Sequence, residues 1–425
     1  MINAEVSQST GLVDKHLLIA GIYYRPEATG IATYTTALAE YLVKRGMKVT
    51  VLAGMPHYPR WRVFDGYEGR LTSWETLNGV DVRRLRTFIP QRQSAVRRAV
   101  YEFSFTFHIL WLRKSLNPDA IMGVVPSLSG GLVAAAASNR FRRPYGLWVQ
   151  DLTGPAAEQS GIAGGSGTVA KLTGRLEGRI LRAARRIAIV SEGFRPYLRR
   201  HGIAPERLEY LPNWSHIPAP NKDRSVVRAE LGWAPEEQVV LHAGNMGLKQ
   251  GLENVVEAAK LLLDKPATRF VFLGDGSQRT KLETLARDLT NLRFMDPVAD
   301  QDFANILSAA DVLLVNERES VADMSLPSKL TSYFLVGRPV VAAVASSGAT
   351  ARFLNESGAA LVVPAGDPRA LVDALNRLGS EPTLRGELTA SAARFASINL
   401  ETSSILRRFE DLVTELVNSG DEDLQ

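Results

Sequence analysis

Short apolar runs alternate with amphipathic stretches along nearly the whole chain, and this alternation constrains the fold more than any other feature. The runs in the first half are HLLIAGIYY, KVTVLAG, DAIMGVV, YGLWVQD and RIAIVS, and those in the second half are VVLHAG, FVFLGDG, LRFMDPV, DVLLVN, PVVAAV and AALVVP. Such runs indicate buried strands, and the stretches between them, such as Thr33–Arg45, have helical spacing. The pattern predicts an α/β protein with doubly wound parallel sheets.

The length of the chain predicts two domains. At 425 residues it exceeds one ordinary core, and residues Leu211–Ala234, rich in Pro, Asn and Ser, form the expected boundary. We therefore predict an N-terminal domain at residues 15–212 and a C-terminal domain at residues 235–400. A last helical pattern, at residues 401–420, follows the final predicted strand.

Composition excludes several kinds of site. The chain has no cysteine, which excludes disulfides, thiolate metal sites and a cysteine nucleophile, and which fits a reducing cytoplasm. The six histidines lack the spacing of metal ligands, so we predict neither a metal site nor a bound cofactor. The N-terminus shows no basic segment followed by a long apolar core, so we expect no signal peptide and a cytoplasmic protein.

Charge is distributed unevenly along the chain. Residues 1–220 contain 29 Lys and Arg against 16 Asp and Glu, whereas the remainder contains 21 against 29. Such asymmetry favours an anionic partner for the first half, either a membrane surface or a lipid-linked phosphate. A solvated arginine-rich surface is the alternative. No recognition motif supports nucleic acid, so we predict no nucleic-acid partner.

Two segments of the second half have the character of phosphate-binding sites. The segment Gly244–Gly251 (GNMGLKQG) is glycine-rich, carries Lys249 and precedes a helical pattern. The segment Leu326–Ala342 (LPSKLTSYFLVGRPVVA) places Lys329 before an apolar helical run. Free N–H groups, the helix dipole and a lysine all favour an anion. Two such sites in one half of the chain suggest a nucleotide diphosphate ligand.

The motifs, taken in their order, resemble one enzyme family. The series GIYYRPEATGIATYTTALAEYL, WVQDLTG, GNMGLKQGLENVVEAA and LPSKLTSYFLVGRPVVAA resembles the retaining glycosyltransferases of family 4, and more narrowly the branch that builds exopolysaccharides of the colanic-acid type. The similarity runs from about Lys15 to Leu412. It implies a GT-B fold, in which two Rossmann-like domains face each other across a cleft and the last helix returns to the N-terminal domain.

The resemblance also implies a reaction. A family member moves a sugar from a nucleotide diphosphate donor to an acceptor hydroxyl, with retained anomeric configuration and without a metal. The expected acceptor is a polyprenyl-diphosphate-linked saccharide at the inner face of the membrane. Two other functions stay open: a soluble transferase that acts on a small molecule, and a non-catalytic protein that binds a nucleotide sugar.

The resemblance assigns the donor site mainly to the second half. It implies that Lys249 contacts the donor diphosphate and stabilises charge on the departing nucleotide, with Lys329 as a second cation. Asn245 stands near the position where many relatives have an arginine. Gly244 and Gly276 are expected to let the backbone approach the donor, although Gly276 could equally serve a tight turn.

The chain departs from the family in one respect. Relatives have two glutamates with seven residues between them, but the corresponding positions here, counted back from Gly337, are Met324 and Ser332. Ser332 is therefore expected to replace the usual ribose contact. Asp323 and Ser325 are the remaining candidates for sugar and phosphate contacts.

The first half supplies the candidates for the acceptor side. Gly30, in the segment ATGIA, is expected to approach the donor phosphates or the acceptor. Asp151, at the end of the WVQD strand, is the best carboxylate for orienting the acceptor hydroxyl or accepting its proton, and capping of the following turn is the alternative. His57, in MPHYP, is a second catalytic candidate, although a lone loop histidine is more often structural.

The segment Arg92–Lys114 combines basic ends with aromatic residues. It is too short and too interrupted to span a bilayer, but as an interfacial helix it could contact anionic lipid. A helix that covers the sheet is the alternative. The residues predicted to contact the membrane or the acceptor are Arg92, Arg97, Arg98 and Trp111.

Overall fold

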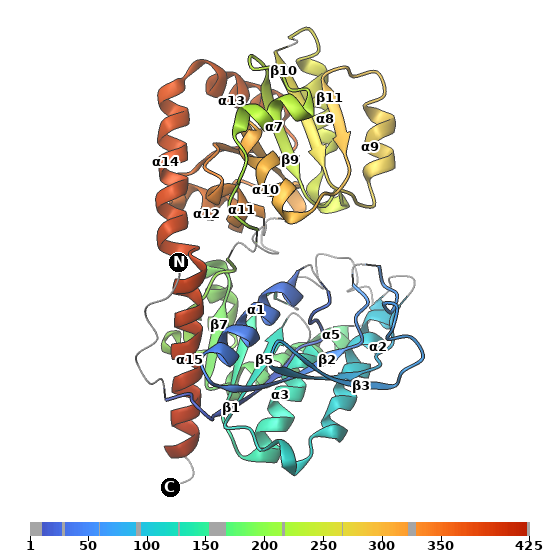
Figure 1. The fold of residues 1–425 in the computed structure, drawn as a ribbon, viewed down its shortest axis with the longest axis vertical. Helices are drawn as coiled ribbons and strands as arrows, with labels where there is room; N and C mark the ends of the chain where they lie inside the picture. Colours follow the sequence, from blue (N-terminus) through green and yellow to red (C-terminus); the bar gives the residue numbers. More distant parts are fainter. Residues whose placement is uncertain are drawn as a thin grey trace. The chain divides into compact units, whose positions relative to one another are not determined.

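The computed structural model describes residues 11–27, 30–58, 60–90, 95–125, 128–152, 167–214, 217–265, 267–321 and 329–422. Contacts within the chain divide it into two compact units. Unit 1 comprises Met1–Pro212 together with Ser403–Gln425, and unit 2 comprises Asn213–Thr402. Each unit is an α/β layer structure built around one sheet (Figure 1).

The sheet of unit 1 has the strand order β3-β4-β2-β1-β5-β6-β7-β8 in the described residues. Neighbouring strands are parallel except for the antiparallel pair β3 and β4 at one edge. The strands are β1 (His16–Ala20), β2 (Lys48–Gly54), β3 (Thr72–Leu77), β4 (Val80–Leu85), β5 (Ala120–Val125), β6 (Tyr145–Val149), β7 (Arg186–Ile189) and β8 (Leu208–Tyr210). The helices are α1 (Ile31–Lys44), α2 (Ala95–Phe105), α3 (Leu128–Phe141), α5 (Gly167–Ala183) and α6 (Arg195–Arg200).

The hairpin β3–β4 has no counterpart among the predicted strands. Its residues alternate between buried and more exposed positions, because the edge of the sheet is covered on one face only. The five strands that the sequence does predict are continuous apolar runs, and all of them are found as β1, β2, β5, β6 and β7. Continuous runs indicate strands buried on both faces, whereas a half-exposed edge hairpin gives a weaker signal.

The sheet of unit 2 has the strand order β11-β10-β9-β12-β13-β14, and all its neighbouring strands are parallel. The strands are β9 (Gln238–Ala243), β10 (Thr268–Leu273), β11 (Leu292–Met295), β12 (Val312–Asn316), β13 (Val340–Val344) and β14 (Ala360–Pro364), each within a run that the sequence predicts. The helices are α7 (Arg224–Leu231), α8 (Glu253–Leu261), α9 (Arg279–Leu285), α10 (Asp300–Ala309), α11 (Lys329–Leu335), α12 (Ala349–Ser357), α13 (Pro368–Ser380) and α14 (Pro382–Asn399).

Two separate apolar clusters cover the two faces of this second sheet. One cluster contains the side chains of Leu241 and Leu313, and the other contains Val240 and Leu314, their neighbours along β9 and β12. Successive residues of a strand point to opposite faces, so these strands are buried on both sides. The doubly wound parallel architecture predicted from the sequence is confirmed.

The last helix, α15 (Thr402–Glu422), packs on unit 1 (Figure 1). The ring of Phe409 lies 4.6 Å from that of Trp148 on β6. A Cβ added at Gly146 would come within 2.8 Å of Leu416, so the glycine allows the helix to approach the strand closely. The helix continues to Glu422, two residues beyond the end of the predicted pattern at residue 420, and Val413, Leu416 and Val417 are all buried.

Candidate functional site

Two loops of unit 2 meet at the carboxyl ends of β9 and β10. A Cβ added at Gly274 would lie 2.1 Å from the carbonyl oxygen of Gly244, and Gly274 has a positive φ of 136°. The amide of Met246 donates a 2.8 Å hydrogen bond to the carbonyl of Asp275, which joins the loops directly. In parallel α/β sheets this edge is where ligands bind, so these contacts shape a candidate binding surface.

Gly276 is required by a close approach within the protein itself. A Cβ at this position would lie 2.6 Å from both the side-chain oxygen of Asn245 and the backbone of Met246. Asn245 is exposed beside it. The structure therefore supplies a packing reason for the glycine.

Lys249 is exposed on a 3₁₀ turn, Leu248–Gln250, whose backbone is held firmly. The carbonyl of Lys249 accepts a 3.0 Å hydrogen bond from the amide of Arg318, and the carbonyl of Gln250 accepts a 2.7 Å bond from the side chain of Asn316. Asn316 is the last residue of β12, and Arg318 follows that strand. The loop is thus fixed to the neighbouring strand while the lysine side chain stays accessible.

Lys329 approaches the same loops from α11. Its ammonium nitrogen lies 3.4 Å from Nε2 of His242. A Cβ added at Gly244 would lie 3.9 Å from the same nitrogen. His242 is fully buried at the end of β9, where its Nε2 also lies 3.4 Å from the carbonyl oxygen of Asn245. The sequence analysis does not single out His242, because one histidine inside an apolar run has no pattern to distinguish it.

Electrostatics favour an anion at this cluster. Burial lowers the pKa of Lys329 to about 8, and the nearby carboxylate of Glu317 opposes that shift. Burial raises the pKa of Glu317, while hydrogen bonding by Thr350 and the charges of Lys329 and Lys249 lower it. Two lysines therefore act on the carboxylate of Glu317, which places Lys249 and Lys329 near each other beside the glycine-rich loop.

The other residues predicted for the donor site are either buried or outside the described residues. Ser332 is buried on α11. Asp323 and Ser325, together with Met324, lie outside the described residues. The arrangement around Lys249 and Lys329 therefore rests on the loops after β9, β10 and β12 and on the first residue of α11.

In unit 1, His57 is enclosed by the protein. Its side chain has no exposed surface, Nδ1 lies 2.8 Å from the carbonyl of Met55, and Nε2 lies 3.1 Å from the hydroxyl of Tyr101. Its backbone amide donates a 2.9 Å bond to the buried carboxylate of Glu27. This environment favours the structural role that the sequence left open, because no face of the ring is accessible to a substrate.

Gly30, predicted to approach the donor phosphates or the acceptor, and Asp151, predicted for the acceptor side, lie at the carboxyl edge of the first sheet, after β1 and β6 respectively. Gly30 is exposed at the start of α1 with a φ of 62°. Asp151 is partly buried, and its carboxylate accepts a 2.9 Å bond from the amide of Leu152. That bond fits the turn-capping alternative.

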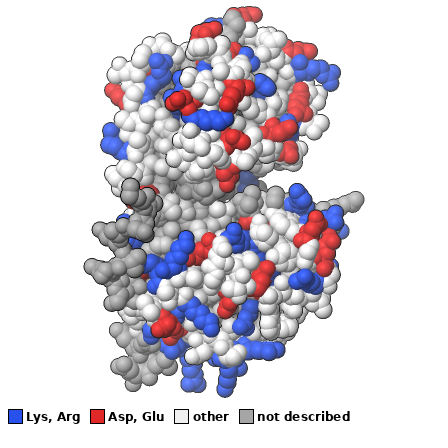
Figure 2. All heavy atoms as spheres, in the orientation of Figure 1, with Lys and Arg blue, Asp and Glu red and all other residues white. Residues whose placement is uncertain are grey.

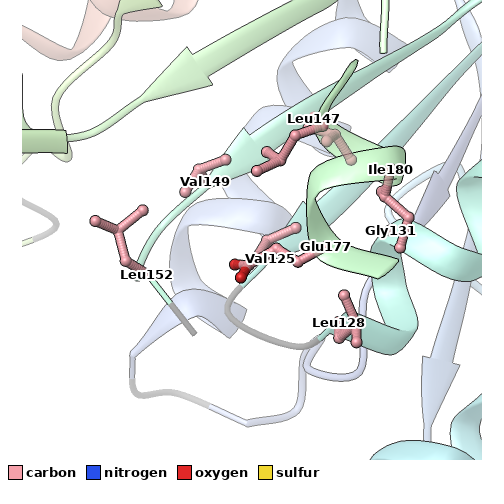
Figure 3. Close-up of a pocket in the computed structure, with 9 residues that line it drawn as sticks. Val125, Leu128, Gly131, Leu147, Val149, Leu152, Glu177 and Ile180 are labelled. Atoms are coloured by element: carbon pink, nitrogen blue, oxygen red, sulfur yellow. The ribbon is translucent and has the colours of Figure 1, made fainter. Parts of the chain in front are cut away.

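A small cavity lies beside this edge, beneath α5 (Figure 3). Its lining consists of Val125, Leu128, Gly131, Leu147, Val149, Leu152, Glu177, Ile180 and Leu181. Glu177 is the ionisable group of this set, and its carboxylate accepts a 2.8 Å bond from the hydroxyl of Tyr197. An apolar wall with one carboxylate does not suit a phosphate, so the anion-binding features identified here belong to unit 2.

The predicted basic and aromatic segment forms α2 and a 3₁₀ helix at Thr106–Trp111. Arg97 is exposed, and Trp111 is partly buried with its ring 6.5 Å from that of Trp74. Arg92 lies outside the described residues, and the side chain of Arg98 is not described. On the face drawn in Figure 2, Lys and Arg side chains lie scattered among Asp and Glu rather than in one continuous patch.

The described part of the chain contains neither a metal-binding cluster nor a membrane-spanning helix. No group of three or more His, Asp or Glu side chains there could hold a metal ion. No helix there is both long and apolar enough to cross a membrane.

Known proteins of similar sequence cover both halves of the chain. Residues 29–214 match the model of the glycosyl transferase 4-like domain, and residues 237–381 match that of the glycosyl transferases group 1. A putative colanic acid biosynthesis glycosyl transferase of Escherichia coli, WcaI, is 31% identical over 415 residues, covering 92% of this chain and 98% of the relative. A probable glycosyltransferase of Pseudomonas aeruginosa, WbjE, is 26% identical over 49% of this chain and 53% of its own length.

Solved structures share the fold. Sucrose-phosphate synthase of Thermosynechococcus elongatus superposes with a TM-score of 0.72 at 18% identity, covering 95% of this chain and all of that one. HepE of Anabaena, solved in complex with UDP, superposes with a TM-score of 0.70 at 16% identity, covering 94% of this chain and all of that one. The chain thus has the GT-B fold, and from the two matched domains and the full-length relative we conclude that it belongs to the glycosyltransferases with a 4-like N-terminal domain and a group 1 C-terminal domain.

Proposed function

We propose that this glycosyltransferase moves a sugar from a nucleotide diphosphate donor to a hydroxyl of a lipid-linked saccharide during polysaccharide biosynthesis, with retained anomeric configuration. The observation that carries the donor assignment is the cluster of Lys249 and Lys329 beside the loop at Gly244. The complexes of HepE with UDP and with UDP-glucose support a nucleotide donor. The colanic acid function named for the Escherichia coli relative supports a polysaccharide product.

In this proposal the two lysines supply the electrostatic part of catalysis. A cation beside the diphosphate stabilises the transition state more than the bound substrate, because negative charge develops on the departing nucleotide in the transition state. Asp151 orients the acceptor hydroxyl and accepts its proton. The lysines take the place of a divalent cation, so we expect EDTA to leave transfer unchanged.

A thermal-shift screen of the full-length protein tests the donor site. UDP-, GDP-, TDP- and ADP-sugars are compared with the natural chain and with Lys329→Met. One class of donor should raise the melting temperature of the natural chain, because a ligand that binds only the folded state stabilises it. Stabilisation that persists in Lys329→Met would contradict the role of that lysine, and no response to any nucleotide sugar would contradict the donor proposal itself.

We further propose that unit 1 contacts an anionic membrane where the lipid-linked acceptor resides. Large apolar side chains are exposed along α2 and the 3₁₀ helix that follows it, with Phe103 65% exposed and Leu110 78% exposed. Trp74 on the neighbouring hairpin is 59% exposed. Residues 85–116 contain six Lys and Arg but one acidic residue, Glu102. Exposed aromatic and aliphatic groups with flanking cations are typical of surfaces that bind anionic lipid.

Co-sedimentation with liposomes tests this contact. The double variant Phe103→Ser/Leu110→Ser should lose most binding to vesicles that contain phosphatidylglycerol, and high salt should weaken binding of the natural chain. Ile398→Ser is the matched control, because Ile398 is 74% exposed on α14 of unit 2. Equal sedimentation with neutral and anionic vesicles at every salt concentration would contradict the membrane proposal and leave a soluble acceptor as the alternative.

A further inference from the structure

A buried histidine lies directly beneath the lysine that we assign to the donor diphosphate. His242 has no exposed surface, and its Nε2 is 3.4 Å from the ammonium nitrogen of Lys329. The ring of Phe272 packs edge-on against the imidazole at 5.8 Å and fixes its plane.

We propose that His242 is a positioning residue for the donor site: its neutral imidazole accepts a hydrogen bond from the Lys329 ammonium and holds that cation beside the glycine-rich loop. The inference rests on the proposed function only in so far as Lys329 is taken to bind the donor. The contact itself belongs to the unliganded protein.

The chemistry of the two groups determines which tautomer is needed. A lysine ammonium has three N–H donors and no acceptor, so Nε2 of His242 must present its lone pair and the proton must reside on Nδ1. The carbonyl of Asn245, also 3.4 Å from Nε2, favours the opposite tautomer. The proton on Nδ1 has no hydrogen-bond partner among the described residues, so this tautomer depends on the charge-assisted bond from Lys329, which is about twice as strong as a neutral one.

The charged surroundings agree with a neutral ring. Burial, followed by the charge of Lys329, holds the pKa of His242 well below its usual value. Among the described residues, the carboxylate whose charge acts on Lys329 is that of Glu317, and the hydroxyl of Tyr333 on the same helix accepts a 2.9 Å bond from the amide of Ala243. A protonated imidazole would instead repel the lysine and displace it from the loop.

Competitive acetylation of the unliganded full-length protein tests the proposal. The rate at Lys329 is measured by mass spectrometry relative to the exposed Lys265 between pH 7 and 9. His242→Met, which lacks a good acceptor, should make Lys329 react at least threefold faster at pH 7.5, because its ammonium form loses a stabilising partner. His242→Gln keeps an acceptor oxygen and should stay within twofold of the natural chain. Phe272→Leu is the control for altered packing.

An unchanged rate at Lys329 in folded His242→Met would overturn the proposal, and so would equal effects of the Met and Gln variants.

Should the Met variant not fold, long-range ¹⁵N–¹H spectra of the natural chain with labelled histidine decide the tautomer, with His242 assigned from the Gln variant. A proton on Nδ1 is expected, and a proton on Nε2 would overturn the proposal. Failure of UDP-, GDP-, TDP- and ADP-sugars to protect Lys329 in the natural chain would instead count against the donor assignment.

Discussion

The hydroxyl of Tyr41 on α1 donates a 2.6 Å hydrogen bond to the carboxylate of Glu410 on α15, joining two helices that are 369 residues apart in the chain. Arg45 donates to the same carboxylate at 3.0 Å, and Glu410 is buried. The last helix is therefore held on unit 1 by a specific polar contact as well as by apolar packing.

Glu410→Ala should loosen this helix. Removal of the carboxylate breaks two hydrogen bonds from partly exposed donors, each worth about 0.5–1.5 kcal/mol. Amide hydrogen exchange in α15 should become faster than in the natural chain. The adjacent exposed residue provides a matched control, because Asp411→Ala should leave the exchange unchanged. Equal exchange in both variants would mean that apolar packing alone holds the helix.

Gly274→Ala should disrupt unit 2. The added Cβ would lie 2.1 Å from the carbonyl oxygen of Gly244, a backbone atom that cannot move aside without separating the loops. We expect a loss of at least about 3 kcal/mol, among the largest effects of a single substitution. In contrast, Gly386→Ala on α14 meets no atom within 4 Å and should stabilise the helix by up to about 1 kcal/mol. Chemical denaturation of the two variants measures both effects.

Lys249→Ala should weaken donor binding or turnover at least tenfold, which corresponds to about 1.4 kcal/mol for a charge-assisted phosphate contact. Lys260→Ala provides the control, because this exposed lysine on α8 pairs with Glu257. Titration calorimetry with the donor identified by the screen gives the affinities. Unchanged affinity and turnover in a folded Lys249→Ala protein would remove this lysine from the site.

Donor binding should take up protons near pH 8. Because the pKa of Lys329 is about 8 in the unliganded protein, part of its population is neutral there, and a bound diphosphate restores the charged form. Calorimetry in buffers of different ionisation enthalpy should reveal uptake of a fraction of a proton at pH 8.5. That uptake should vanish in Lys329→Met. Uptake of the same size in the variant would assign the proton to another group.

The stability of unit 1 should respond to Glu27. Burial raises the pKa of this carboxyl to about 7, even though the amides of His57, Tyr58 and Tyr24 and the charge of Arg84 act in the opposite direction. The native state therefore retains a proton that the unfolded chain releases near pH 4.5. The contribution of Glu27 to stability must fall as pH rises from 4.5 through 7.

Glu27→Gln removes this titration while keeping an oxygen that can accept from the amides of His57 and Tyr58. The melting temperature of the variant relative to the natural chain should therefore increase between pH 5 and pH 8, corresponding to at most about 3 kcal/mol. A difference that is constant over this range would show that Glu27 does not titrate as its burial implies.

Some of the fold could be predicted because its signal is local. Strands such as β9 and β13, buried on both faces, are necessarily continuous apolar runs, and the helices between them have apolar residues at helical spacing. The hairpin β3–β4 escaped prediction because its residues face the core on one side only. The candidate lysines were found for a similar reason, since glycine-rich segments with one lysine are visible in the sequence alone.

The sequence by itself thus determined the doubly wound class of the two sheets and pointed to the lysines of the proposed donor site, because periodicity, glycine and charge act over a few residues. Tertiary structure alone decided which side chains meet. It brought His242 under Lys329, 87 residues away, and enclosed His57 between Met55 and Tyr101. Such contacts depend on how strands are ordered and how loops cross at the sheet edge, and the packing of the whole unit sets that order, which no short stretch of sequence records.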